Sequence, residues 1–296
     1  MKIHNVQIAP RTFYAWCSRG PSRRALWDAT ITEILAGYYL PDENGRLPPE
    51  SLYGAVKMWA HLNRQGIPVA RCTVERLMRA NGWRGVRRGR RVRTTVSSGT
   101  DRAADLVNRQ FRAAAPNQLF VTDFTYVPLS SGRFVYTAFV IDAYAGTIVG
   151  WHTATHADHT LVGRALSDAR ETRRREGHPI SAGAVHHSDA GVQYTSIAFG
   201  KNLLDAGIFP SIGSVGDAYD NALAETIIGL YKTECVRADS PFHTDLHTIA
   251  DVERATAAWV HWYRTRRLMH HLGLRPPAEA EADYYAQHSP TQQVTQ

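Results

Sequence analysis

The chain has 296 residues, of which 44% are hydrophobic and 10% aromatic, as is typical of a globular protein with one sizeable core domain and smaller parts beside it. No apolar run approaches the roughly 18 residues of a membrane helix, and three scattered cysteines argue against a disulfide framework or a thiolate zinc site. The first residues lack the apolar core of a signal peptide, so we expect a cytoplasmic protein with no membrane partner.

Positive charge is concentrated in the first part of the chain. Residues 1–116 carry 20 Lys and Arg against 8 Asp and Glu, whereas residues 117–296 carry 14 against 19. A basic segment favours a polyanionic partner, because contacts to phosphates release counterions. The acidic remainder would need metal ions to neutralise its carboxylates before it could approach a nucleic acid.

Residues 1–83 are predicted to form a small all-α region with a helix-turn-helix that binds DNA. One helix is predicted over 23–39, and apolar residues at helical spacing predict a second from Glu50 to Leu62 and a third from Thr73 to Asn81. A Gly-containing turn joins the last two, as in a helix-turn-helix, and Arg71 and Thr73 are the predicted DNA contacts there. An ordinary helical hairpin is the alternative.

Residues 84–116 are predicted to be a basic linker. Six arginines within ten positions cannot be buried, so this run is expected to be exposed and to bind DNA phosphates. Such runs also occur as segments that only keep a protein soluble. The arginines are Arg84, Arg87, Arg88, Arg90, Arg91 and Arg93.

From 117 to 285 the pattern becomes one of strands and helices, and 286–296 is predicted to be a tail. Strands are predicted over 119–127, 134–142, 147–153, 184–188 and 208–212, and helices over 158–176, 196–206, 219–235 and 246–263, followed by a Pro-containing stretch. The order βββαβαβα is that of a ribonuclease-H-like α/β fold, a mixed five-stranded sheet with flanking helices.

Three acidic residues are the strongest functional signal. Asp123 falls within the first predicted strand and Asp189 just after the fourth, and these strands are neighbours in that fold. Glu225 would project from the helix after the fifth strand. Three converging carboxylates can hold two Mg²⁺ or Mn²⁺ ions, which catalyse in-line displacement at a phosphodiester. These residues are therefore the predicted catalytic residues and metal ligands.

Other polar residues stand close to this acidic set in the sequence. Asn221 and Lys232 are four residues before and seven after Glu225, which places all three on one helical face, so they are predicted to hold DNA beside the metals. A solvated helix residue is the alternative for Lys232. His186 and His187 are candidates to support the metal ligands. A His187-Ser188-Asp189 relay is rejected, because adjacent strand residues face opposite sides.

The local sequences are also those of a known family. Tyr-Asp-Asn-Ala-Leu-Ala-Glu-Thr-Ile-Ile-Gly-Leu-Tyr-Lys-Thr-Glu (219–234) and Val-Ala-Arg-Cys-Thr-Val-Glu-Arg-Leu-Met (69–78) resemble the second-frame transposases of bacterial insertion sequences, which carry a retroviral-integrase-like core with a DDE triad. The resemblance runs from about Ile8 to Tyr285.

The resemblance implies Asp123, Asp189 and Glu225 as ligands of Mg²⁺, cleavage at the terminal inverted repeats of the element, and attack of the freed 3′-hydroxyl on target DNA. It further implies a nucleoid-associated homo-oligomer that joins two DNA ends, and leaves open an upstream-frame fusion partner. The family commonly has Arg where Ala190 stands here. Two alternatives remain: a catalytically impaired DNA-binding repressor of transposition, and a ribonuclease-H-like nuclease.

Overall fold

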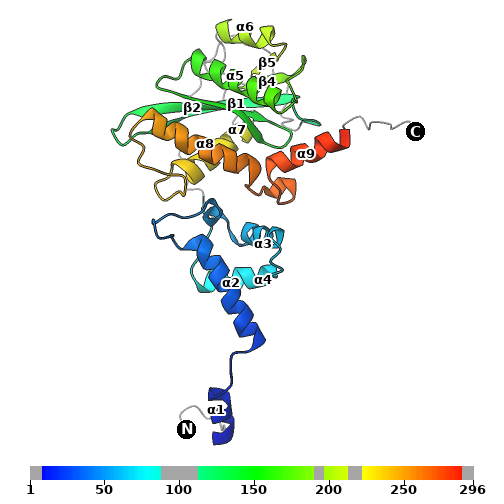
Figure 1. Cartoon of the computed structure of the whole chain (residues 1–296). Helices are drawn as coiled ribbons and strands as arrows, with labels where there is room; N and C mark the ends of the chain where they lie inside the picture. Colours follow the sequence, from blue (N-terminus) through cyan, green and yellow to red (C-terminus); the bar gives the residue numbers. More distant parts are fainter. Residues whose placement is uncertain (1–8, 88–112, 190–196, 213–221, 289–296) are drawn as a thin grey trace, which may run out of the picture. The chain divides into compact units, whose positions relative to one another are not determined.

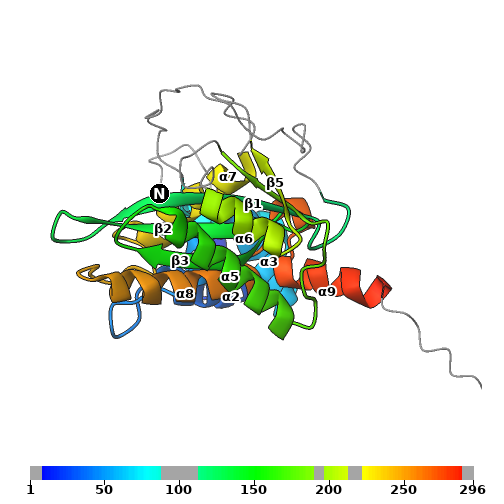
Figure 2. The ribbon, with the colours of Figure 1, turned by 90° about the horizontal axis from the view of Figure 1, so that it is seen from above.

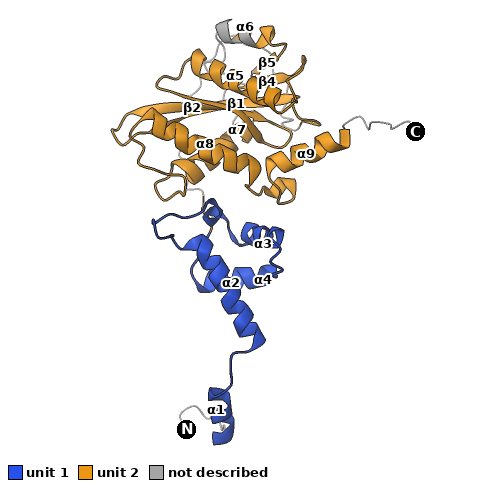
Figure 3. Cartoon of the chain, in the orientation of Figure 1, with its two compact units in different colours: residues 1–84 blue, residues 85–296 orange. Residues whose placement is uncertain are grey.

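The computed structural model describes residues 9–87, 113–189, 197–212 and 222–288. The chain divides into two compact units, Met1–Arg84 and Gly85–Gln296 (Figure 3). The division falls at the start of the predicted basic linker, most of which lies outside the described residues.

The N-terminal unit is a small helical domain. Its elements are α1 (Pro10–Cys17), α2 (Arg23–Tyr39), a 3₁₀ turn (Pro49–Leu52), α3 (Ala55–Arg64) and α4 (Arg71–Ala80). Ile31 and Leu35 of α2, Met58 and Leu62 of α3 and Val74 of α4 are fully buried, so three helices share one core. The turn between α3 and α4 contains Gly66 at φ +80°, a conformation that glycine adopts without strain. The predicted all-α unit with its helix-turn-helix is confirmed.

Two details of this unit differ from the sequence prediction. The helix predicted from Glu50 to Leu62 is wrong as a single element, because the chain is extended at Tyr53 and Gly54, and α3 begins only after them. Helix α1 was not predicted at all. It has only eight residues, about two turns, which is too short for a helical period to stand out, and none of them is buried.

The C-terminal unit is built on a mixed five-stranded sheet in the order β3-β2-β1-β4-β5. The strands are β1 (Leu119–Pro128), β2 (Phe134–Asp142), β3 (Thr147–Ala154), β4 (Val185–Ser188) and β5 (Phe209–Ile212). Strands β1 and β3 each pair antiparallel with β2, β4 is parallel to β1, and β5 is parallel to β4. The predicted ribonuclease-H-like sheet is confirmed, with β4 beside β1.

Helices cover both faces of this sheet (Figures 1 and 2). They are α5 (His159–Arg175), α6 (Ile197–Asp205), α7 (Ala222–Tyr231), α8 (Ile249–Thr265) and α9 (Pro277–His288), with a single π-helical turn (Lys232–Val236) directly after α7 and a 3₁₀ turn (His270–Leu272) before α9. None of the described helices is long and apolar enough to cross a membrane.

Alternation along the strands sends apolar side chains into two cores. Phe120 and Val140 point toward α5 and α6, where they join a buried cluster that includes Leu161. Phe139 points the other way, and its ring lies 5.0 Å from that of Tyr231 and 6.2 Å from that of Trp259. The central strands are therefore buried on both sides.

Helix α9 corrects the prediction of a Pro-containing, non-helical stretch after the last helix. Pro277 stands in the first turn of α9, where proline costs no hydrogen bond because that N–H would have no helical partner. Glu281 of α9 accepts two hydrogen bonds, at 2.7 and 2.8 Å, from the buried guanidinium of Arg173. That guanidinium also donates to Asp142 at 2.9 Å, so a buried charge cluster fixes α9 to the end of β2 and to α5.

Gly150 is required where β3 meets α5. A Cβ at this position would lie 2.3 Å from the carbonyl oxygen of Ala165 and 2.5 Å from the amide nitrogen of Ala169. Because both are backbone atoms, we expect Gly150→Ala to lower the free energy of unfolding by about 3 kcal/mol or more. Denaturant unfolding measures this loss. Gly200→Ala is the control, because nothing lies within 4 Å of the added atom there, and an equal effect in both variants would contradict the close approach.

Candidate active site

Two of the predicted catalytic acids lie side by side at one end of the sheet. In the parallel pairing of β1 with β4, Thr122 is opposite Ser188. Asp123 follows the first of these residues and Asp189 the second, so both carboxylates emerge from adjacent strands at the same point, where β4 has ended. Asp189 is exposed and Asp123 partly buried. The strand order confirms the prediction that the strands which carry these two residues are neighbours.

Electrostatics join Glu225 to this pair. Burial, followed by the charge of Asp189 and then that of Glu225, raises the pKa of Asp123 to about 8. The N–H of Phe124, which donates to Asp123 at 2.8 Å, and the charge of Lys232 act in the opposite direction. Four side chains from three separate segments therefore influence one another at this end of the sheet.

Glu225 is placed by the packing of α7. Ala224, Ile227, Ile228 and Tyr231 are buried, which fixes the helix against the face of the sheet that carries Phe139. Glu225, in the first turn of α7, is left partly exposed. A carboxylate in the first turn is also favoured by the partial positive charge of a helix N-terminus.

A buried ion pair holds the π-helical turn that carries Lys232. Within that turn Glu234 is bound by the guanidinium of Arg267, at 2.8 Å from Nε and 2.5 Å from Nη2, and by the indole N–H of Trp259 at 3.3 Å. The Nζ of Lys232 lies 4.5 Å from the centre of the Tyr126 ring. Burial lowers the pKa of Lys232, and the charge of Asp123 opposes that shift.

Lys232 does not continue the regular α-helical spacing that was predicted for Asn221, Glu225 and Lys232. A π-helical turn begins at Lys232, so regular α-helical spacing no longer applies beyond Tyr231. The charge of Lys232 nevertheless acts on Asp123, and its Nζ lies over the ring of Tyr126 on β1. Asn221 lies outside the described residues.

The two histidines before Asp189 lie on opposite faces of β4. His187 shares the face of Asp189, is fully buried, and its Nδ1 is 3.0 Å from the Ser211 hydroxyl. His186 points to the α5 face, where its Nε2 is 2.7 Å from the Thr122 hydroxyl, and burial lowers its pKa to about 4. His187 can therefore support the strand end beneath the acids, whereas His186 acts at most through Thr122.

Three carboxylates form a donor set suited to Mg²⁺ or Mn²⁺, both of which prefer oxygen ligands. Burial is the main cause of the raised pKa of Asp123, and the charges of Asp189 and Glu225 add to it, so a cation bound here would favour the charged carboxylate. Among the described residues, no three His, Cys, Asp or Glu side chains form a ready-made metal site. Side-chain movement would therefore have to accompany the binding of an ion.

The structure describes only some of the DNA contacts that were predicted on α4 and in the basic linker. Arg71 is exposed on α4 and pairs with Glu75 at 2.6 Å, while Thr73 is half-buried. Arg84 and Arg87 are exposed after α4. The other predicted arginines, Arg88, Arg90, Arg91 and Arg93, lie outside the described residues.

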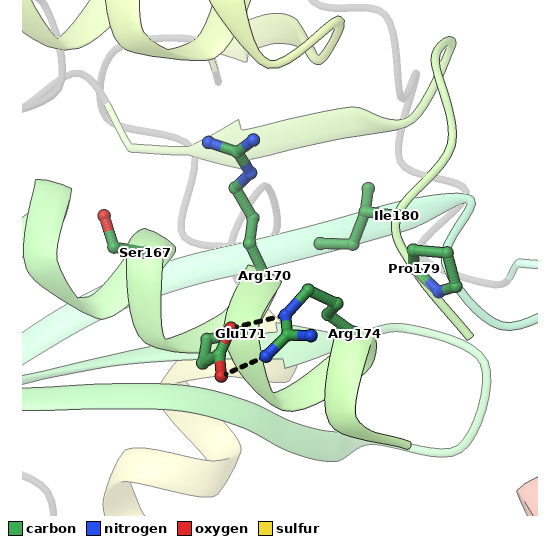
Figure 4. Close-up of a pocket in the computed structure, with 6 residues that line it drawn as sticks. All are labelled: Ser167, Arg170, Glu171, Arg174, Pro179 and Ile180. Atoms are coloured by element: carbon green, nitrogen blue, oxygen red, sulfur yellow. Dashed lines mark hydrogen bonds and ion pairs between the residues drawn. The ribbon is translucent and has the colours of Figure 1, made fainter. Parts of the chain in front are cut away.

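A hollow on α5 stands apart from the acids (Figure 4). Its lining residues are Ser167, Arg170, Glu171, Arg174, Pro179 and Ile180. Arg174 is held by Glu171 of the same helix, at 2.8 and 2.9 Å. Because α5 covers the face of the sheet opposite α7, this hollow is not part of the acidic site.

Sequence reasoning missed Tyr126, which touches Lys232 and stands three residues after Asp123 on the same strand. Its place three residues after Asp123 on the same predicted strand was the available signal. The exposed half of the ring could not be deduced from the pattern, because aromatic residues in strands are usually buried.

Comparison with known proteins gives the family. Models described as "Integrase core domain" match residues 113–218 and 206–277, and one described as "HTH-like domain" matches residues 43–91. A protein of Mycobacterium tuberculosis assigned as transposase for insertion sequence element IS986/IS6110 is 48% identical over 281 residues, 95% of this chain and 97% of that protein. The transposase for insertion sequence element IS629 of Shigella sonnei is 46% identical over 95% of this chain and 90% of its own length.

Among solved structures, the HTLV-2 integrase catalytic core domain in complex with magnesium aligns with a TM-score of 0.43 at 14% identity, over 57% of this chain and 99% of that one. The relatives in the preceding paragraph, similar along nearly their whole length, decide the assignment. This chain belongs to the insertion-sequence transposases with an integrase core and a helix-turn-helix-like domain.

Proposed function

We propose that this transposase cuts DNA at the ends of its insertion sequence and transfers the freed 3′-hydroxyl to target DNA, with Asp123, Asp189 and Glu225 as catalytic residues. The observation that carries the proposal is that Asp123 and Asp189 follow paired residues of β1 and β4, and that the charges of Asp189 and Glu225 help to raise the pKa of Asp123. DNA is the partner, and the cytoplasmic nucleoid, where a bacterial element lies, is the expected location.

Each acid has a distinct place in this proposal. Asp123 and Asp189, fixed by adjacent strands, would hold two Mg²⁺ or Mn²⁺ ions between them, and Glu225 would complete the ligands from α7. The bound ions would activate the attacking oxygen and stabilise the leaving oxygen. Lys232, beside Asp123, would hold the neighbouring DNA phosphate, because an ammonium group is a strong partner for phosphate.

The basic parts of the chain would bring DNA to this site. Arg71 and Thr73 on α4 would contact the terminal repeats, and the arginines of 84–93 would bind phosphates along the linker. Because two element ends must be cut together, we infer that the working form is a homo-oligomer. Whether an upstream-frame fusion is required would be decided by comparing the two forms in the same assay.

The first test is metal-dependent cleavage. Protein with Mg²⁺ or Mn²⁺ is expected to nick a DNA fragment that carries the inverted ends of the element and to join the 3′ end to a second DNA. Asp189→Asn should lose both products but bind the fragment as well as wild type, because its carboxylate contacts the metals rather than the bases. Gel electrophoresis of labelled strands and a gel-shift titration measure the two properties.

Asp168→Asn is the matched control, since it removes a half-exposed carboxylate from α5 on the far face of the sheet. This variant should cut and join normally. Full cleavage in excess chelator would rule out the proposal. Binding of the ends without any cut product would identify a repressor, and hydrolysis without joining would identify a nuclease.

A further inference from the structure

Two exposed aromatic rings meet beside the acidic site. Tyr126 on β1 and Phe134 on β2 are 52% and 50% exposed, and their ring centres lie 5.4 Å apart at an interplanar angle of 87°. We call this pair the hairpin platform. Single exposed aromatic residues need no explanation, but two in contact on neighbouring strands offer a continuous apolar surface that water solvates poorly.

The hairpin that carries the platform is held in place. Leu129 and Arg133 close it by a 2.8 Å backbone hydrogen bond, and Gly132 adopts φ +79° in the turn. Ser130 donates from its N–H at 2.8 Å to the carbonyl of Leu246, which belongs to the segment before α8. Anchoring of this kind presents the two rings in a fixed position, so little entropy would be lost when a ligand stacks on them.

The platform is close to the reacting end of the sheet. Tyr126 is three residues after Asp123 on the same strand, about 10 Å at the usual rise, and at this odd spacing their side chains leave opposite faces of the strand. The ring is still within reach of the acidic side, because Lys232, whose charge acts on Asp123, lies 4.5 Å from its centre. Successive phosphates in one strand of duplex DNA are about 3.4 Å apart along the axis, so the platform would face a nucleotide within about three steps of a phosphate held at the acids.

Positive charge accompanies the rings. Lys232 lies over Tyr126 and also acts on Asp123, and Arg133 is exposed next to Phe134. A protein partner with an apolar surface would gain nothing from these cations. A nucleotide needs both features, because its base stacks on an aromatic ring while its phosphate pairs with an ammonium or guanidinium group.

Building on the function proposed above, we propose that Tyr126 and Phe134 form a stacking platform for an unpaired base of the DNA strand whose phosphate lies at the acidic site. Lys232 would leave the face of the Tyr126 ring for a backbone phosphate and thereby open that face to the base. The platform thus assigns a substrate class: DNA ends with at least one unpaired nucleotide next to the cut. It reads no sequence, since every base has a face that can stack.

The test is a binding measurement that needs no chemistry. The full chain is titrated, with Ca²⁺ in place of Mg²⁺, against a duplex with a short unpaired 3′ overhang that contains 2-aminopurine, and against the blunt duplex of the same sequence. Wild type is expected to bind the overhang duplex more tightly and to quench its fluorescence. Tyr126→Ala and Phe134→Ala should each weaken overhang binding roughly tenfold, leave blunt binding unchanged and abolish quenching.

Two variants distinguish stacking from a general loss of surface. Tyr126→Phe keeps the ring and should keep both affinity and quenching. Phe209→Ala removes a ring that is 53% exposed at the start of β5, opposite Val185 and away from the acids, and should change nothing. The three side chains to be changed are about half exposed, so a thermal melt should show unaltered folding.

Equal weakening of overhang and blunt duplexes, or unchanged binding in Tyr126→Ala, would overturn the platform. A change of oligomeric state in Tyr126→Ala without a change in overhang affinity would assign the rings to a contact between copies and overturn it as well. Failure of the proposed cleavage activity can be told apart from failure of the platform, because a protein that never cuts DNA can still prefer the overhang duplex.

Discussion

Asp123→Asn is expected to abolish DNA cleavage and, in the same protein without metal, to increase stability. Cleavage should fall by at least about a thousandfold, because an amide is a poor ligand for Mg²⁺ and the developing phosphate charge loses its stabilisation. Stability should rise by about 1–3 kcal/mol near neutral pH, because the change removes a crowded carboxyl whose pKa burial and the charges of Asp189 and Glu225 raise to about 8.

The stability gained by Asp123→Asn is expected to depend on pH. The unfolded side chain releases its proton near its ordinary pKa of about 4, whereas the folded one keeps it up to about 8. Between these values the folded protein binds more protons, so wild-type stability falls as pH rises. The stability gap between Asp123→Asn and wild type should therefore widen from about pH 4 to about pH 8 and then level off. Urea unfolding in chelator at several pH values measures it.

The Asp168→Asn control should keep cleavage, since its carboxylate lies on the other face of the sheet, and should gain less stability than Asp123→Asn, since this carboxyl is about half exposed. Added Mg²⁺ should raise the melting temperature of wild type more than that of Asp123→Asn, because the ion binds the folded carboxylates. A variant at Asp123 that still cuts DNA, or one that is less stable than wild type at every pH, would contradict the convergence of charge at this site.

Arg173→Met is expected to cost about 3–5 kcal/mol of folding free energy. The guanidinium is buried and binds Asp142 at 2.9 Å and Glu281 at 2.7 and 2.8 Å. Removing it leaves the buried carboxylates of Asp142 and Glu281 without a counterion, and an uncompensated buried charge strongly destabilises the fold. Chemical denaturation should show the loss, and proteolysis should cut near α9 first, because Glu281 is its link to α5 and β2.

The next residue supplies the control. Arg174 is exposed and pairs with Glu171 of the same helix, so Arg174→Met should leave stability almost unchanged. The double variant Arg173→Met with Glu281→Gln should recover part of the loss, since one uncompensated charge is removed. Equal stability of the Arg173 and Arg174 variants would show that the buried cluster does not hold α9.

The amino-acid sequence by itself determined the order of strands and helices in the C-terminal unit, because each element carries a clear period of apolar residues. It also singled out Asp123, Asp189 and Glu225, because each lies in a distinctive local sequence and the elements that carry them come together in the predicted fold. It failed at α1, which has only eight residues, at α9, where a proline in the first turn resembles a helix stop, and at the break before α3, where one glycine interrupts a regular pattern.

Other features were decided only by the tertiary structure. The parallel pairing of β1 with β4 set Asp189 beside Asp123, and the packing of α7 brought Glu225 and Lys232 to them, although 35 residues of chain separate the last two acids. In the same way, distant segments decide that the rings of Tyr126 and Phe134 stay exposed and that Arg173 and its partners are buried. Burial and charge at a residue are sums over neighbours in space, and local sequence contains only the neighbours along the chain.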